Sequence, residues 1–406
     1  LVSFSRPNAK ETPTLAFEEE SYSAYVGNEL TITATTTSDG VITYSSSDPD
    51  VATIDATTGV VTALAAGTVT ITATVAETET FESKTATVEL TVSIDPANVV
   101  GYKYALITDE AGLVEGSKVI IANKEYKVAM STDQKSNNRG EAAITFDDND
   151  NAIVENNGNV QVFTLEIGGS NTLCYFNTGN DNYIYAASSS SNYLRTKSSK
   201  DDDAKARVAF DSEGNTTVVF QGTYNNNHLQ YNSNNKLFSC YAESNSQEPV
   251  QLYKQMTVAA NVTGVGYATF SSTEAVDFTD VENIYAYTAS VEGDAITFNR
   301  ITKVPAKTGV LLRSIEGGEA TANVPVLNTA PAVEGNALVA VAETQAVETG
   351  NTNYILNQSA NGGAGFYLAA GNNVAAGKAY LHVEGTAGVK SFAISFDDIE
   401  TAITGV

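Results

Sequence analysis

The sequence predicts an all-β protein, and three observations support this prediction. Residues 31–35, 69–75 and 86–92 alternate apolar and polar side chains with a period of two, which places one face of each strand on a core and the other in water. Thr and Val dominate these runs, and their β-branched side chains suit a pleated strand. Turn-forming residues recur about every ten positions, and no apolar stripe with helical spacing extends beyond two or three turns. Frequent turns between short strands are typical of sandwiches and barrels.

Length and charge limit the number of domains and the class of partner. The chain has 406 residues, with 22 Lys and Arg against 48 Asp and Glu, for a formal net charge of −26 at pH 7. This length suits two to four compact units. An acidic surface repels phosphate backbones and anionic lipid headgroups, so neither nucleic acid nor a membrane surface is an expected partner. No apolar stretch is long enough to cross a bilayer, so no membrane span is expected.

Residues 13–95 carry a spacing pattern that is specific to one kind of domain. Four short motifs follow one another at fixed intervals: Ser46-x-Asp48, Val51-Ala52-x-Ile54-Asp55, Thr58-Gly59-x-Val61-Thr62-Ala63 and Gly67-Thr68-x-Thr70-Ile71. This pattern resembles the bacterial Ig-like domain of group 2, with Ile54 where Val is usual. The resemblance implies an Ig-like β-sandwich that serves as a spacer or adhesive stalk on a bacterial surface, with no binding site of its own. Gly59 and Gly67 are both expected at turns that require positive φ.

Residues 100–255 form the second predicted unit, separated from the first by Asp95-Pro96-Ala97-Asn98. Residues 127–131, 184–188 and 229–233 look alike, and each is followed by a turn rich in Ser and Asn. Each is also followed by a pair of apolar residues two positions apart, namely Phe163 with Leu165, Val208 with Phe210, and Val250 with Leu252. Three repeats of about four strands resemble a β-trefoil, with an insertion near 147–150 in the first repeat. The alternative is one irregular sandwich whose internal similarity arises by chance.

Residues 258–406 are predicted to form a third all-β domain of the β-sandwich type. Residues 304–311 are echoed by 374–381, and each segment is a turn that leads into a buried strand. Residues 266–396 resemble a region found near the C-terminus of secreted Bacteroidetes proteins, and 396–405 resemble the lead-in to their sorting tail. These likenesses imply a secreted or cell-surface location, associated with the outer membrane.

Few residues are suited to catalysis or to metal binding. His228 and His382 lie in different predicted units, so neither a Ser/His/Asp nor a Cys/His device is expected. No His/Cys cluster has the spacing of a zinc site, and no cofactor motif is present. The acidic runs 147–151 and 201–203 lack the alternation of a calcium loop and are interpreted as solvated loop tips. Cys174 and Cys240 are either bridged or two small buried hydrophobic residues. The chain is therefore expected to be non-enzymatic, without cofactor or metal.

Two functional classes remain, and the residues favour a site in the middle unit if a small ligand binds. The first class is adhesion by contact with a cell-surface protein of a host, and the second is carbohydrate binding; a monomer is expected in both. Sugars are recognised by aromatic faces together with planar amides. The candidate glycan-binding residues are Asn192, Tyr193, Tyr224, Asn225 and Asn226. Tyr231 and Leu229 share one face of a strand and are expected in the core. The alternative is that tyrosine packs the core throughout and asparagine only closes turns.

Overall fold

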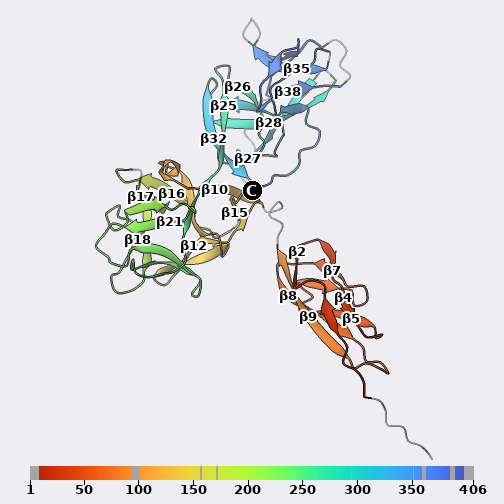
Figure 1. Ribbon diagram of the computed structural model, residues 1–406. Helices are drawn as coiled ribbons and strands as arrows, with labels where there is room; N and C mark the ends of the chain where they lie inside the picture. The colour runs from red at the N-terminus through yellow and green to blue at the C-terminus, as the bar shows by residue number, and fades with distance from the viewer. Residues whose placement is uncertain are drawn as a thin grey trace, which may run out of the picture. The chain divides into compact units, whose positions relative to one another are not determined.

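The computed structural model describes residues 9–93, 100–155, 158–170, 172–293, 295–350, 352–358, 363–384 and 389–396 (Figure 1). Its regular structure consists of strands and one short 3-10 helix, η2 (Glu110–Gly112), so the all-β prediction is confirmed. The chain divides into two compact units, residues 1–98 and 99–406. The boundary predicted at Asp95-Pro96-Ala97-Asn98 lies outside the described residues. No helix among those residues is long and apolar enough to cross a membrane.

The first unit is a sandwich of short strands. They are β1 (Leu15–Phe17), β2 (Ser21–Tyr25), β3 (Glu29–Thr31), β4 (Ala34–Thr36), β5 (Ile42–Ser46), β6 (Ala52–Ile54), β7 (Val60–Ala63), β8 (Gly67–Val75) and β9 (Lys84–Ser93). One sheet has the order β2-β9-β8-β5 and a second has the order β3-β7-β6, while β1 pairs with β4. The predicted alternation holds in β8, where Val69, Ile71, Ala73 and Val75 are buried. Val61 of β7 shares a core with Ile71 and Leu90, so apolar side chains from both sheets join the layers.

Two local predictions in the first unit are corrected by the structure. Residues 31–35 do not form one strand, because the chain leaves β3 at Thr31 and joins a different sheet at Ala34. Gly59 has φ 71°, as predicted, and a Cβ there would lie 2.3 Å from the carbonyl oxygen of Ile32. Gly67 has no positive φ: it begins β8, and a Cβ there would lie 3.1 Å from a methyl group of Val51. Close packing, not a left-handed turn, therefore explains the second glycine.

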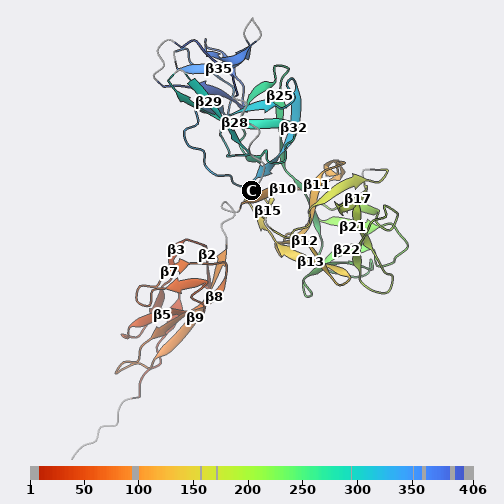
Figure 2. The same ribbon diagram turned by 180° about the vertical axis from the view of Figure 1, so that it is seen from behind.

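The first part of the second unit holds the strands of residues 100–255, seen from two sides in Figures 1 and 2. They are β10 (Gly101–Leu106), β11 (Lys118–Asn123), β12 (Val128–Lys135), β13 (Asn138–Ala143), β14 (Thr145–Phe146), β15 (Ala152–Glu155), β16 (Phe163–Ile167), β17 (Leu173–Gly179), β18 (Asn182–Ala186), β19 (Leu194–Lys197), β20 (Ala206–Phe210), β21 (Thr216–Phe220), β22 (His228–Asn232), β23 (Leu237–Tyr241) and β24 (Gln251–Gln255).

Six of these strands close into a ring. The antiparallel pairs are β11–β16, β16–β17, β17–β20, β20–β21 and β24–β11. A bridge between Thr216 of β21 and Val250, which precedes β24, completes the circuit. Three hairpins, β12–β13, β18–β19 and β22–β23, each lie in sequence between two ring strands. The three similar stretches of the sequence lie on β12, β18 and β22, and their apolar pairs lie on or next to β16, β20 and β24. The additional strands β14 and β15 occupy the insertion predicted near 147–150 and pair with each other.

The core of the ring explains the two cysteines. Cys174 and Cys240 are both fully buried among Phe163, Phe176, Phe238 and other apolar side chains. Burial raises the pKa of the Cys174 thiol to about 12 and raises that of Cys240 as well. Cys240 is a free thiol, so the two are not bridged to each other and the interpretation as small buried hydrophobic residues is confirmed.

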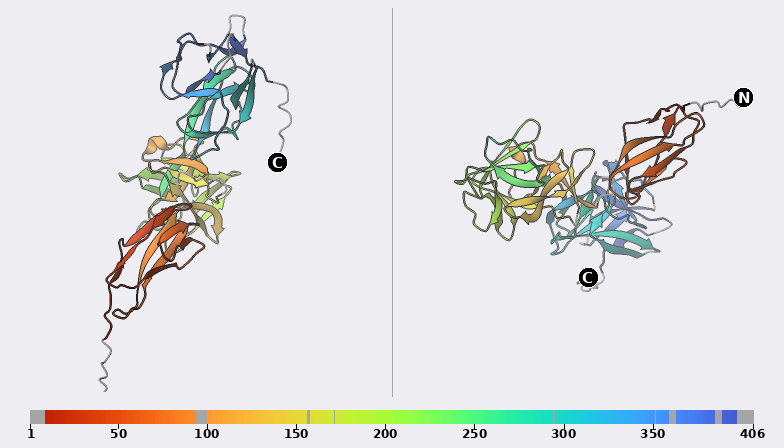
Figure 3. Two further views of the ribbon diagram at one scale, coloured as in Figure 1. Left: turned by 90° about the vertical axis from the view of Figure 1, so that its right-hand side faces the viewer. Right: turned by 90° about the horizontal axis from the view of Figure 1, so that it is seen from below.

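The remaining strands continue the second unit, as Figure 3 shows from two further directions. They are β25 (Thr257–Val262), β26 (Tyr267–Phe270), β27 (Ala275–Asp277), β28 (Ile284–Glu292), β29 (Ala295–Ile301), β30 (Lys303–Val304), β31 (Val310–Ser314), β32 (Ala320–Leu327), β33 (Leu338–Val341), β34 (Gln345–Ala346), β35 (Asn353–Gln358), β36 (Ala364–Leu368), β37 (Asn373–Val374), β38 (Lys378–His382) and β39 (Ser391–Ala393).

A central sheet, β26-β31-β28-β29, packs on both faces. Leu312 points into a core shared with β25 and β32, and its neighbour Leu311 points into a core shared with the sheet β33-β38-β35-β36-β39. Alternate side chains of one strand therefore serve two cores. The predicted turn-and-strand echo corresponds to β30 with β31 and β37 with β38. The predicted sorting-tail resemblance falls on 396–405, of which the structure describes only Phe396.

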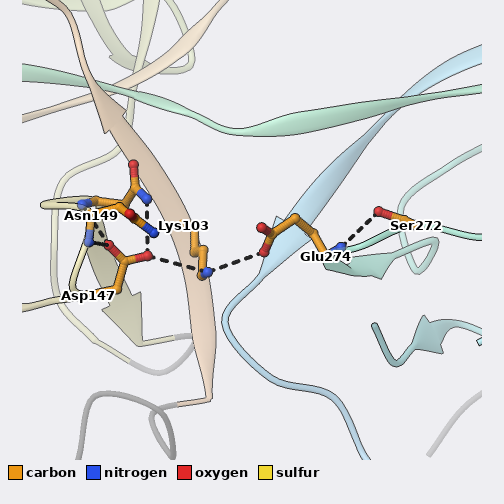
Figure 4. A network of polar contacts seen from close by, with 6 residues as sticks. Lys103, Asp147, Asn149, Ser272 and Glu274 are labelled. Atoms are coloured by element: carbon orange, nitrogen blue, oxygen red, sulfur yellow. Dashed lines mark hydrogen bonds and ion pairs between the residues drawn. The ribbon is translucent and has the colours of Figure 1, made fainter. Parts of the chain in front are cut away.

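Strand β10 ties the two parts of the second unit together. Tyr104 pairs with Gln255 of β24, and Tyr102 pairs with Leu327 of β32. In Figure 4, Lys103 lies between two carboxylates: its Nζ is 3.3 Å from Asp147 and 3.2 Å from Glu274. The division into domains 100–255 and 258–406 stays a prediction, because the described contacts keep both in one compact unit.

The prediction of a solvated loop tip is wrong for Asp147, because its side chain is only 15% exposed. Partial burial would raise the pKa of this carboxyl, yet hydrogen bonds from Asn151, Asn149 and Lys103 hold the pKa below its ordinary value. A carboxyl with a lowered folded-state pKa stabilises the fold at neutral pH, and that contribution is lost as the pH falls through the folded-state pKa.

We expect Lys103→Met to destabilise the second unit by about 1–3 kcal/mol, because it leaves the half-buried Asp147 without its cation. Lys124→Met is the matched control, since Lys124 pairs with Asp150 but both side chains are exposed. The control should cost less than about 0.5 kcal/mol. Urea unfolding of both full-length variants measures the difference, and equal losses would contradict a special role for Lys103.

Candidate functional site

A polar cavity of about 560 Å³ lies among the hairpins of the first two repeats. We call it the Arg139 cavity. Its lining residues are Gln134, Ser136, Arg139, Gln161, Thr178, Gly179, Asn180, Asn182, Arg195 and Thr196. They come from the β12–β13 hairpin, the approach to β16, the β17–β18 turn and β19. Amide, hydroxyl and guanidinium groups therefore converge from four segments that are far apart in the sequence, and no carboxylate lies among them.

Arg139 is the buried charge of this cavity. Its side chain is 6% exposed, and its Nη2 donates to Gln161 Oε1 at 2.6 Å while Nη1 donates to the Thr132 carbonyl at 3.3 Å. Its Nε has no hydrogen-bond partner among the described residues, and neither has the buried hydroxyl of Thr196. Burial lowers the pKa of Arg139, while the charge of the exposed Asp133 partly opposes this shift. No carboxylate in the described part of the chain lies within ion-pair distance of Arg139.

Gln161 fixes the position of the Arg139 guanidinium. The Gln161 amide is itself 7% exposed, and its Nε2 donates to the carbonyls of Val162 at 2.9 Å and Thr178 at 3.3 Å. Because Nε2 donates to both of these carbonyls, the orientation of the amide is fixed, and its Oε1 faces Arg139 and accepts the hydrogen bond from Nη2. The side chain of Gln161 thereby joins the cavity floor to the β17–β18 turn.

The β17–β18 turn forms one wall, and its sequence suits its backbone. Gly179, Asn180 and Asp181 have φ values of 109°, 51° and 54°. Glycine adopts positive φ freely, and Asn and Asp tolerate the left-handed region better than other residues do. The side-chain amide of Asn182 donates to the backbone carbonyl of Asn180 at 3.0 Å, and the Thr178 hydroxyl donates to the backbone carbonyl of Asn182 at 3.1 Å. These bonds hold the turn in one shape beside Arg139.

Arg195 forms the exposed rim of the cavity. Its Nε donates to Asn137 Oδ1 at 2.8 Å, and its guanidinium carbon lies 4.9 Å from the centroid of the Tyr193 ring. The Leu194 amide also donates to the Asn137 carbonyl at 2.8 Å, so the tip of the β12–β13 hairpin is bound to β19. Arg195 is thus held by an amide on one side and an aromatic ring on another.

The predicted glycan-binding residues form an arc that continues from this rim. Asn192 accepts a hydrogen bond from the Asn226 side chain at 3.0 Å, and the Asn225 amide donates to Ser189 Oγ at 3.0 Å. Tyr193 is half-buried under Arg195. Tyr224, predicted as a glycan-binding residue, is also half-buried, and it packs against the apolar core of the ring. Leu229 and Tyr231 are buried, as predicted.

Sequence reasoning missed the residues that make the cavity, above all Arg139 and Gln161. Arg139 is the second residue of β13, a polar strand whose sequence does not alternate, and a charged side chain in such a strand is normally expected in solvent. Its burial depends on Gln161 and Thr178, which belong to other strands and lie far along the chain. No local pattern separates it from the exposed Arg207 of β20.

The histidines occupy separate polar settings. His228 Nδ1 lies 3.0 Å from Asn227 Oδ1, and His382 Nδ1 lies 2.7 Å from Asn353 Oδ1. Within the described residues, no group of three or more His, Cys, Asp or Glu side chains is arranged to hold a metal ion.

Comparison with known proteins identifies one domain. The family model of the bacterial Ig-like domain (group 2) matches residues 26–88, which confirms the N-terminal resemblance. No curated protein matches the chain. Among solved structures, a match described as "Structure and mode of action of a mosquitocidal holotoxin" has 9% identity and a TM-score of 0.28, and covers 70% of this chain and 35% of that one. The chain thus spans about a third of that protein, and so low a score supports no argument about fold or function.

The cavity generates a prediction about stability. Gln161→Leu should lower the free energy of unfolding by about 1–3 kcal/mol, because it leaves a buried guanidinium N–H of Arg139 without its acceptor. Arg139→Met should cost less than Gln161→Leu or even stabilise the fold, since it replaces a buried, uncompensated cation with an apolar side chain of similar length. Urea unfolding monitored by far-UV circular dichroism compares the two variants. A larger loss in Arg139→Met would show that the arginine is chiefly a structural residue.

Proposed function

We propose that this chain is a non-enzymatic, secreted or cell-surface protein whose residues 100–255 form a β-trefoil module that binds carbohydrate. The observation that carries the proposal is the Arg139 cavity. Side-chain amides, hydroxyls and guanidinium groups supply the directional donors and acceptors that sugar hydroxyls need. A volume of about 560 Å³ lies in the range of small-ligand sites and has room for one or two sugar rings.

The strand pairing supports the trefoil assignment. A ring of six strands with one hairpin for each pair of ring strands, repeated three times, is the arrangement that three similar repeats would build. The inserted β14–β15 pair interrupts only the first repeat. The repeats differ at their hairpins, and the cavity involves the hairpins of the first two.

The N-terminal domain supports a surface location for the whole chain. Its match to the bacterial Ig-like domain fits a spacer that carries the second unit, and the spacing pattern that carries the resemblance includes framework turns such as the one at Gly59. Adhesion to a cell surface would then follow from sugar contact by the second unit, with the chain acting as a monomer. Direct contact with a host protein is the competing outcome.

The arc of Asn192, Tyr193, Asn225 and Asn226 extends the proposed site beyond the cavity. Tyr193 presents its ring to Arg195, which lines the cavity, and so connects the two regions. A glycan too long for the cavity would therefore extend onto this arc. Tyr224 contributes to the module chiefly by packing.

A glycan array probed with the full-length chain tests the proposal. Tyr193→Ala should weaken binding about two- to five-fold, the loss expected for a cation–π contact of about 0.5–1 kcal/mol, with little change in melting temperature. Tyr224→Ala should instead lower the melting temperature, because its ring packs on the core. Tyr25→Ala, an exposed tyrosine of the first unit, is the control and should change neither quantity. If the intact chain binds no glycan but retains a host protein, the carbohydrate proposal is wrong.

A further inference from the structure

We infer that the Arg139 cavity selects an acidic sugar, one that carries a carboxylate or a sulfate ester, and that Arg139 and Arg195 receive the anionic group. This inference rests on the proposed carbohydrate binding and specifies the class of sugar. Neutral-sugar sites need donors and acceptors in balance, whereas this cavity places two cations at its floor and rim.

Arg139 carries a buried charge that no carboxylate of the described residues meets at ion-pair distance and that the exposed Asp133 offsets only in part. Arg139 is only 6% exposed, so its guanidinium has lost most of its hydration, and its direct partners are an amide oxygen and a backbone carbonyl. Buried charges in folded proteins are ordinarily paired with an opposite charge. An anion in the adjoining cavity would supply that charge, and a charge-assisted hydrogen bond is about twice as strong as a neutral one.

Two of the residues that line the cavity, Arg139 and Thr196, each have a buried polar atom without a hydrogen-bond partner among the described residues. Arg195 is oriented by Asn137 and Tyr193 rather than by a carboxylate, so its charge is also uncompensated in the described part of the chain. Among the described residues the ion pairs are all made by lysine, and Arg139 is distinguished from the other arginines by its burial.

The net charge of −26 repels an anionic ligand, whereas the arginines of the cavity attract it. The distance over which each charge acts decides which effect is larger. At about 0.15 M salt the Debye length is about 8 Å, so charges farther away than this are largely screened. Arg139 is buried beside the cavity, which strengthens its attraction for an anion there, whereas Arg195 is exposed and contributes a screened charge at the rim. Asp181 lies in the β17–β18 turn but does not line the cavity. Short acidic glycans should therefore bind, whereas long polyanions gain nothing from additional charges.

Isothermal titration of the full-length chain with trigalacturonic acid, its methyl ester and a 6-sulfated trigalactose tests this inference. The ester keeps the sugar and removes the charge. We expect trigalacturonate or the sulfated sugar to bind at least tenfold more tightly than the ester, and the arm that binds identifies the anionic group. This comparison needs no variant.

Three variants locate the site. Arg139→Met should reduce the affinity for the acidic sugar at least tenfold and the weak affinity for the ester by a much smaller factor, because the ester loses a neutral hydrogen bond but no ion pair. Arg139→Lys should lose less, because it keeps the charge but not the planar donors. Arg207→Met is the matched control: it removes one positive charge from an exposed position on β20 outside the cavity, and should change affinity less than twofold.

Two results would overturn the inference, and they are distinguishable. Equal binding of the acid and the ester, unaffected by Arg139→Met, would leave carbohydrate binding standing and refute acidic selectivity. Absence of binding to all three sugars, together with an empty glycan array, would refute the proposed function as well.

Discussion

Closing six strands into a ring is the constraint on which the structure of residues 100–255 depends. The interior of the ring is filled by apolar side chains from the ring strands and the three hairpins. The rings of Phe163 and Phe176 meet there edge to face, with their centroids 5.8 Å apart. Because that space has no room for polar groups, the polar residues of the repeats are confined to the hairpins and turns. The Arg139 cavity lies where two of these hairpins and the β17–β18 turn approach one another. Its position follows from the closure of the ring.

The buried guanidinium is the feature that a structural role explains least well. Desolvating a cation costs several kcal/mol unless an opposite charge compensates it, and an apolar replacement is often as stable. Arg139 is instead held by the neutral Gln161, which orients it without neutralising it. A side chain that is well positioned but electrostatically uncompensated is what binding of an anion requires. In contrast, Lys103 pairs with two carboxylates and joins β10 to its neighbours, as expected for a structural cation.

The sequence predicted those features that depend on local patterns. Alternation located β8 and β9, and the spacing around Gly59 identified both the Ig-like domain and a left-handed turn. The three similar stretches of the sequence each lie on the first strand of a hairpin, namely β12, β18 and β22. The errors arose where distant contacts decide the outcome. Position 67 requires glycine because the side chain of Val51 packs against it. Asp147 is half-buried because Lys103 of β10 pairs with it. The burial of Arg139 is not predictable from its neighbours in the sequence either, because it depends on Gln161, which lies on another segment.

The Nε–H signal of Arg139 in a ¹H–¹⁵N spectrum reports directly on whether an anionic sugar approaches the guanidinium. Because Arg139 Nε is buried, its proton should exchange slowly and give a resolved signal that disappears in Arg139→Lys. We expect this signal to shift in a saturable way when an acidic oligosaccharide is added and to stay in place when the methyl ester is added. If the acid leaves this signal unmoved while other signals of the chain respond to it, the anionic group does not bind at Arg139.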